Sequence, residues 1–281
     1  MAYVISEFIP EIWSTRLLRH LDKRLVFKQL VNTDYEGEIR GAGDTVHINQ
    51  IGNVTVKEYT VNEAIADPDA LDASQLQLLI NQMRYYNFYV DDVEQAQANV
   101  TIMDKAMARA AYALADEIDQ DIAELHSDAG IELRDSGSAF SVGTDTTSDT
   151  NPYDLIVDIG VSMDENNVPQ QGRWVVIPPW YHGIMLKHED YKQAWQDYMR
   201  TGNIPVVAGF RVLASNNLDN DGTDWHVVAG TTEAISFAGQ LTKTEAYRPE
   251  NRFADAIKGL YVYGRKVVHP GCLADVLVAK A

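Results

Sequence analysis

The fold is decided by the stretch from Gly43 to His126, which reads GDTVHINQIGNVTVKEYTVNEAIADPDALDASQLQLLINQMRYYNFYVDDVEQAQANVTIMDKAMARAAYALADEIDQDIAELH. Its first part is acidic, turn-rich and strand-like, and its last part, Met103 to Leu125, is one long amphipathic helix. The first part does not look like the middle of a compact domain. We therefore expect an arm that leaves the body and buries its apolar face on another molecule, which favours assembly over catalysis.

Two strand-like runs with a turn-rich segment between them predict a long hairpin. Val46 and Ile48 alternate with polar residues, Gly52 begins a turn signal, and alternation resumes up to Val61. An acidic segment with a proline follows, and apolar residues then alternate again at Leu76, Leu78, Ile80, Tyr86, Phe88 and Val90. A two-stranded ribbon alone is marginal in water, so we expect this hairpin, with its mobile tip, to become stable only by lying on something.

The helix from Met103 to Leu125 spans roughly 35 Å at about 1.5 Å per residue, a length that suits a backbone on which other parts pack. Its apolar stripe consists of Met107, Ala110, Leu114, Ile118, Ile122 and Leu125. We expect its acidic residues to occupy mostly other faces, and these are Asp116, Glu117, Asp119, Asp121 and Glu124.

Residues Pro10 to Val31 predict an earlier amphipathic helix with a basic face. Glu11 and Asp22 interrupt that face, so docking on protein is favoured over membrane binding. The longest apolar runs are also far shorter than the roughly 20 residues that span a bilayer. We therefore expect no membrane association.

Residues 127–151 are rich in Ser, Thr, Gly and Asp, and predict a linker or an exposed hairpin that marks the best domain boundary. Helices and strands then alternate, which predicts an α+β domain. The expected helices cover residues 153–163, 180–186 and 190–198. The expected strands cover residues 174–177, 206–214 with a break at Gly209, 226–229, 235–268 with a turn at 248–251, and 273–278.

Composition excludes several classes of protein. The chain has 281 residues and a formal net charge of −18, which argues against a nucleic-acid binder because phosphate contacts need Lys and Arg. Residues 235–281 nevertheless hold more basic than acidic residues, so an acidic middle and a basic end can attract each other between copies. A simply acidic, soluble surface is the alternative. Cys272 is the only cysteine, so no intrachain disulfide is possible, and we expect a small half-buried side chain there.

The sequence contains no recognisable catalytic motif, and we expect no catalytic, cofactor or metal site. The densest group of potential metal ligands is His182 and His188 with Glu189 and Asp190. Its spacing matches no ligand pattern, and a solvated helix end is the better interpretation. A soluble hydrolase with its site near His182 and His188 stays open as an alternative.

The order of elements resembles the major capsid protein of tailed bacteriophages, the Hong Kong 97-type fold: N-terminal arm, extended hairpin, long helix, α+β domain, long β hairpin and a short final strand. Specific strings carry the resemblance. They are Ile9-Pro10-Glu11-Ile12-Trp13, Asp34-Tyr35-Glu36-Gly37-Glu38-Ile39, Gly43-Asp44-Thr45-Val46, the strand, proline and helix at 174–186, and residues 204–218 with Gly209-Phe210 and Ser215-Asn216.

The resemblance implies an N-arm at residues 1–42 and an extended loop at 43–90 that lies over the neighbouring subunit. It implies a peripheral domain at 91–150 and 235–270, with a spine helix at 103–126, and an axial domain at 151–234 and 271–281. Contacts between subunits are then expected at Trp13, Arg16, Arg24, Val54, Val56, Tyr59, Leu76 and Leu78.

The function that the resemblance implies is self-assembly, as pentamers and hexamers, into an icosahedral shell around phage double-stranded DNA. The DNA would be enclosed without sequence-specific binding, and the protein would be found in the virion after assembly in the host cytoplasm. Because the arm begins almost at Met1, we expect a separate scaffolding protein, together with a portal and, as a further option, a decoration protein. We expect no covalent crosslink. An encapsulin-type compartment, which shares the fold, is the other shell hypothesis.

Overall fold

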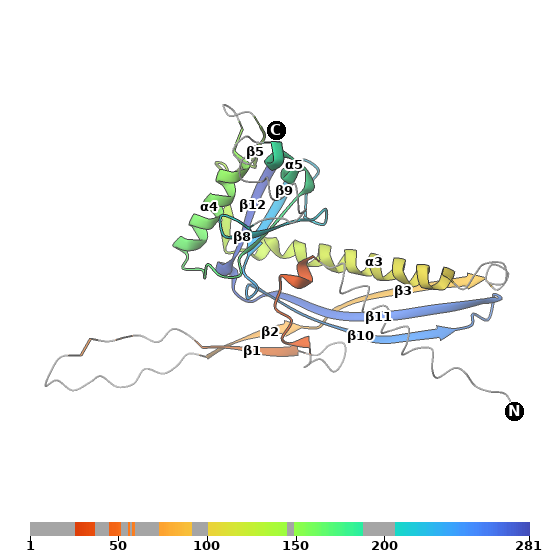
Figure 1. The fold of residues 1–281 in the computed structure, drawn as a ribbon. Helices are drawn as coiled ribbons and strands as arrows, with labels where there is room; N and C mark the ends of the chain where they lie inside the picture. The colour runs from red at the N-terminus through yellow and green to blue at the C-terminus, as the bar shows by residue number, and fades with distance from the viewer. Residues whose placement is uncertain are drawn as a thin grey trace.

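The computed structural model describes residues 26–36, 45–51, 56, 58–59, 73–91, 101–144, 149–187 and 206–281. Figure 1 shows an elongated layer, in which a long helix lies along a sheet, and a more compact part above one end of that layer. The C-terminus lies at the top of the compact part. The expected helix at 190–198 lies outside the described residues.

The elongated layer is a three-stranded antiparallel sheet, here called the long sheet, with strand order β10-β11-β3. Its strands are β3 (Gln82–Asp91), β10 (Ile235–Tyr247) and β11 (Ala254–Val267). β10 and β11 confirm the predicted pair of long strands, and their register shifts by one residue between Leu241 and Lys243. β3 pairs with β11 along its whole length, so residues 82–91, which we expected mostly in the extended loop, are part of this sheet.

The spine helix α3 (Thr101–Ala123), extended by the 3₁₀ turn η3 (Glu124–Asp128), lies along one face of the long sheet (Figure 1). The predicted stripe is confirmed, because Met107, Leu114, Ile118 and Ile122 are buried. The expectation for the acidic residues is wrong at two positions. Asp119 and Asp121 are buried, only 2% and 6% exposed, because both carboxylates bind polar groups of other segments that pack on the helix.

The compact part is built on a seven-stranded sheet of mixed direction, here called the mixed sheet. Its strands are β4 (Ile131–Leu133), β5 (Phe140–Val142), β6 (Trp174–Ile177), β7 (Val206–Val207), β8 (Phe210–Ala214), β9 (Asp224–Gly230) and β12 (Leu273–Lys280). All four residues of β6 are buried, as is typical of a strand covered on both faces. Between β7 and β8, Ala208 and Gly209 have positive φ angles, which explains the predicted break at the glycine.

Two helices pack against the mixed sheet, α4 (Pro152–Glu165) and α5 (Pro179–Lys187). The start of α4 is encoded locally: the Asn151 side chain accepts a hydrogen bond from the Tyr153 amide at 2.9 Å, and Pro152 occupies the first turn. A short 3₁₀ turn, η4 (Pro270–Cys272), leads from the long sheet into β12, and Cys272 is half-buried, as expected.

The segment at 127–151 differs from the expected linker or hairpin. β4 and β5 do not pair with each other; each pairs in parallel with a different part of β12. Each strand has only three residues, too few for alternation to stand out among Ser, Gly and Asp, yet Ile131 and Val142 are buried. The structure thus places residues 131–142, which we expected in the peripheral domain, in the same sheet as the C-terminal strand.

The base of the predicted hairpin is confirmed as an antiparallel pair, β1 (Thr45–Ile51) and β2 (Ala73–Leu79), in which Ile51 lies opposite Ala73. The pair packs against one end of the long sheet, on the face opposite α3 (Figure 1). A cluster shared by the two layers holds it there, and its buried members are Val46, Ile48, Leu78, Ile80, Ala238, Val262 and Val268. Gly264 permits this approach, since a Cβ there would lie 2.4 Å from the Leu79 carbonyl oxygen.

In the described part of the predicted helix at 10–31, the only regular element is the 3₁₀ turn η1 (Phe27–Gln29). The apolar residues of this segment, Phe27, Leu30 and Val31, are buried in the chain's own core. The Phe27 ring packs edge-on against the Trp174 ring, with 6.2 Å between the ring centroids. Asn32 then exchanges backbone hydrogen bonds with β10. The chain's own core therefore supplies the apolar partners of residues 27–31, the end of the segment that we expected to dock on protein.

Candidate assembly surface and its supporting core

The face of the long sheet opposite α3 carries exposed apolar and aromatic side chains. Along β3 the even-numbered residues face the helix and the odd-numbered ones face outward, so Met83, Tyr85 and Tyr89 are 57%, 78% and 51% exposed. β1 and β2 cover only the end of this face near Val262. The remainder is here called the open face, and its exposed apolar side chains are of the kind that marks protein–protein contact sites.

A shallow groove of about 440 Å³ lies on the open face and is lined by Tyr85, Asn87, Lys243, Glu245, Lys258, Gly259 and Leu260. Its charges are matched within the chain. The Glu245 carboxylate contacts Lys243 and lies 3.0 Å from Lys258 Nζ, and these two partners, Lys243 first, lower the pKa of Glu245.

The open face continues to the turn between β10 and β11. There the Arg252 guanidinium lies 4.6 Å from the centre of the Tyr89 ring, and Phe253 is 84% exposed. The aromatic surface therefore runs from the middle of β3 to the end of the long sheet.

Four of the predicted contact residues lie outside the described residues: Trp13, Arg16, Arg24 and Val54. Of the other four, Val56 and Tyr59 are 93% and 65% exposed. Leu76 is half-buried beside the core cluster that holds β1 and β2 on the long sheet. Leu78 is fully buried in that same cluster, so its side chain packs on its own subunit.

The basic residues near the C-terminus are used in part by their own subunit. Arg265 pairs with Glu124 at 2.6 Å and lies 3.8 Å from Asp121, so it binds the end of the spine helix. Lys266 donates to the Gln77 carbonyl of β2. The excess positive charge that we expected to attract other copies therefore has intrasubunit partners at these positions.

The buried carboxylate of Asp119 ties three segments together. It accepts hydrogen bonds from the amides of Val26 (3.1 Å) and Phe27 (2.9 Å), which begin η1, and it lies 3.4 Å from the Asn217 amide nitrogen of the β8–β9 loop. Burial raises the pKa of Asp119 to about 6, against the lowering effect of these hydrogen bonds.

A raised carboxyl pKa makes the folded state take up a proton near pH 6, whereas the unfolded chain takes it up near its ordinary value of 3.8. Stability from this residue is thus gained as pH falls through 6, and lost as pH rises through 6. We expect the unfolding free energy of wild type, relative to Asp119→Asn, to increase by about 2 kcal/mol between pH 7 and pH 4.5. Urea unfolding of both unassembled proteins at the two pH values measures this difference, and a constant difference would contradict it.

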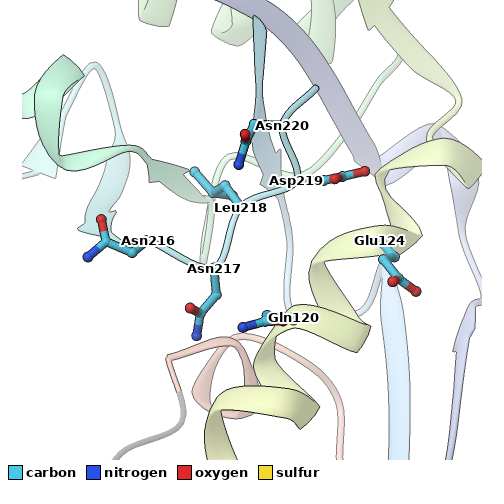
Figure 2. Close-up of a pocket in the computed structure, with 7 residues that line it drawn as sticks. All are labelled: Gln120, Glu124, Asn216, Asn217, Leu218, Asp219 and Asn220. Atoms are coloured by element: carbon cyan, nitrogen blue, oxygen red, sulfur yellow. The ribbon is translucent and has the colours of Figure 1, made fainter. Parts of the chain in front are cut away.

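A polar pocket of about 280 Å³ lies where the end of the spine helix meets the β8–β9 loop. Figure 2 shows Gln120 and Glu124 on the helix and the loop residues Asn216, Asn217, Leu218, Asp219 and Asn220 around it. Asn217 closes one side by donating to Asp116 at 2.8 Å. The pocket thus lies between the spine helix and a loop of the mixed sheet, and the Asn217–Asp116 hydrogen bond joins the two.

The expected group around His182 is only partly visible, because residues 188–190 lie outside the described ranges. His182 itself is on α5, and burial lowers its pKa. Sequence reasoning missed a different group, His126, His226 and Asp275, whose side chains meet in the fold. They are about 100 and 50 residues apart in the chain, so no local spacing signals them. Of the helices that the structure describes, none is long and apolar enough to cross a membrane.

Comparison with known proteins agrees with this architecture. The family model for phage capsid protein matches residues 84–276. A solved structure from Mycobacterium phage Che8 is 30% identical, with 98% of this chain and 94% of that chain covered and a TM-score of 0.72. The capsid structure of cyanophage P-SCSP1u is 16% identical, with 90% and 86% covered and a TM-score of 0.68. No curated protein sequence matches the chain.

The fold is also similar to that of a virus-like particle from Pyrococcus furiosus, with 14% identity, coverage of 96% and 99%, and a TM-score of 0.59. At that identity the likeness shows the fold alone, so it does not raise the compartment hypothesis above the phage one. The family match covers well over half of the chain, from within β3, through the spine helix, most of the mixed sheet, β10 and β11, to the first half of β12. The chain therefore has the Hong Kong 97-type α+β fold, belongs to the phage capsid protein family and is a major capsid protein.

Proposed function

We propose that many copies of this chain, as pentamers and hexamers, close an icosahedral shell around phage double-stranded DNA, and that the open face of the long sheet is a contact surface between them. The observation that carries the surface assignment is the run of exposed apolar side chains at Met83, Tyr85, Tyr89 and Phe253. An isolated subunit gains nothing by exposing these side chains, whereas a neighbour that covers them buries apolar area.

The two sheets support the proposed roles of the parts. The long sheet with α3 serves as the peripheral domain, and the mixed sheet with α4 and α5 serves as the axial domain, now including residues 131–142. Residues 43–81 serve as the extended loop, with its base fixed on its own subunit by β1 and β2. Residues 1–42 serve as the N-arm, anchored where Phe27 enters the core.

The proposed partners are those of a shell that is filled with DNA. A scaffolding protein would direct closure in the host cytoplasm, a portal would occupy one vertex, and a decoration protein would bind the finished virion. A formal net charge of −18 suits a subunit that encloses DNA without gripping it. The proposed role is structural, with no catalytic step.

The assembly surface is tested by the double variant Met83→Ser, Tyr85→Ser. Because truncating a central aromatic anchor costs about 1–4 kcal/mol of contact energy, we expect the yield of closed shells to fall by about tenfold or more. Thermal stability of the unassembled subunit should stay close to wild type, since both side chains are exposed. The control is Tyr153→Ser on α4, 39% exposed and away from the open face. Sedimentation and electron microscopy measure shell yield, and normal shells from the double variant would rule the surface out.

A further inference from the structure

Two histidine rings are stacked where the spine helix ends on the mixed sheet. His126 comes from η3 and His226 from β9, and their ring centroids are 3.8 Å apart with the planes 21° from parallel. Two carboxylates lie beside this histidine stack, Asp275 on β12 and Asp219 in the β8–β9 loop. Figure 2 shows the Asp219 carboxylate beside the end of the helix. Four segments that are remote in sequence thus meet at one pair of rings.

Both nitrogens of the His126 ring face carboxylate oxygens. Nε2 lies 3.0 Å from Asp219 Oδ2, and Nδ1 lies 3.6 Å from Asp275 Oδ2. A neutral imidazole carries a proton on only one nitrogen, so it would turn a lone pair toward one of the two carboxylates. An imidazolium directs an N–H toward each of them, and its positive charge attracts both. The geometry therefore favours the protonated form of His126.

The His226 ring needs no second proton in this arrangement. Its Nδ1 lies 3.0 Å from both carboxylate oxygens of Asp275, a contact that a neutral ring with its proton on Nδ1 satisfies. Two imidazolium rings stacked at 3.8 Å would repel each other, and a neutral His226 avoids that repulsion. The stack is therefore built to hold one positive charge on its two rings.

The charges around the stack balance when His126 alone is protonated. Arg134, which follows β4, donates to the Asp275 side chain and to its main-chain oxygen at 2.9 Å. The same guanidinium lies 4.0 Å from Glu132, which is largely exposed. The positive charges of His126 and Arg134 thus face the two carboxylates of the stack, Asp219 and Asp275.

The same carboxylates shift the titration of His126. Burial alone lowers the pKa of His126, but the carboxylates of Asp275 and Asp219 outweigh burial and raise the pKa above 6.5. Glu124, also on η3, pairs with Arg265 of β11 at 2.6 Å, so its charge is matched on the other side of the turn. Folded subunits therefore keep the proton of His126 at pH values where the unfolded chain has begun to lose it.

We propose that the histidine stack is a pH-sensitive link, in which protonated His126 ties the end of the spine helix to the β8–β9 loop and to β12. A neutral His126 can donate to only one of the two carboxylates, so the link weakens as pH rises. The stability that His126 contributes is fully present below pH 6.5 and is lost as pH rises through its higher folded-state pKa. The stack lies within one subunit, so this inference does not rest on the proposed shell contacts.

The first test is NMR of the histidine ring nitrogens in the ¹⁵N-labelled, full-length unassembled protein between pH 5.5 and pH 9. His126 should carry protons on both nitrogens at pH 6 and lose one with a midpoint above 6.5. Asp219→Asn should lower that midpoint, and the chain should fold normally because Asp219 is about half exposed. The control His47→Gln changes an exposed histidine on β1 and should leave the midpoint of His126 unchanged.

Thermal melting measures how much the link stabilises the subunit. Wild type should melt about 2 °C or more above His126→Gln at pH 6, and this gap should shrink as pH rises to 9. Asp119 titrates in both proteins and so cancels from the gap. If His126→Gln does not fold, Asp219→Asn takes its place in the same comparison. A midpoint at or below 6.5, a midpoint that Asp219→Asn does not lower, or a gap that is constant from pH 6 to pH 9 overturns the proposal.

Discussion

Replacing residues 52–72 by Asn-Gly is expected to leave a folded subunit that no longer closes shells. Ile51 and Ala73 lie directly opposite each other in the β1–β2 pair, so a two-residue turn joins them without moving either strand. The apolar residues that fix the pair to the long sheet, such as Ile48 and Leu78, are all retained. The deleted segment includes Val56 and Tyr59, which are among the most exposed apolar residues of the described chain.

The readout separates folding from assembly. Thermal melting of the shortened subunit should match wild type within a few degrees, while sedimentation and electron microscopy should show no closed particles. A matched control replaces residues 52–72 by a Gly/Ser segment of equal length, which keeps the reach of the loop but removes its side chains. If that control also fails to close shells, side-chain contacts carry the interaction. Normal shells from the Asn-Gly variant would end the extended-loop proposal.

Elements with a strong period could be predicted from sequence. The apolar stripe from Met107 to Ile122 predicted the spine helix, and alternation along residues 82–91 and 235–267 predicted strands. The structure confirms these elements. Their apolar faces are long enough for period 3.6 and period 2 to be told apart. The order of these elements along the chain then led to the capsid family, which the family match confirms.

Features that depend on which segments meet in space could not be predicted. Alternation along Leu76 and Leu78 indicated an apolar face, but not that Leu78 packs on its own subunit. Nothing in the helical pattern distinguishes the buried Asp119 from the exposed Glu117. Asp119 is buried because the start of η1 packs on it and donates two backbone amides to its carboxylate. The group of His126, His226 and Asp275 could not be predicted for the same reason, since its members come from segments that are far apart in the sequence.

The buried carboxylate of Asp121 offers the sharpest test of the core beneath the assembly surface. It accepts from Arg84 Nη2 at 3.1 Å and from the Tyr263 hydroxyl, which is fully buried in β11. Asp121→Ala leaves that hydroxyl without its acceptor, and among the described residues it leaves Arg84 with its outer partner, Glu117, at 3.2 Å.

Removing one member of a buried hydrogen-bonded pair costs more than the pair itself contributes, so we expect Asp121→Ala to lower the unfolding free energy by about 2–4 kcal/mol. Glu117→Ala, on the same helix and with the same arginine, removes an exposed ion pair and should cost less than about 1 kcal/mol. Urea unfolding of the two unassembled variants compares them directly. Equal costs would mean that Arg84 and Tyr263 find other partners, and that the helix is held on the long sheet by its apolar stripe alone.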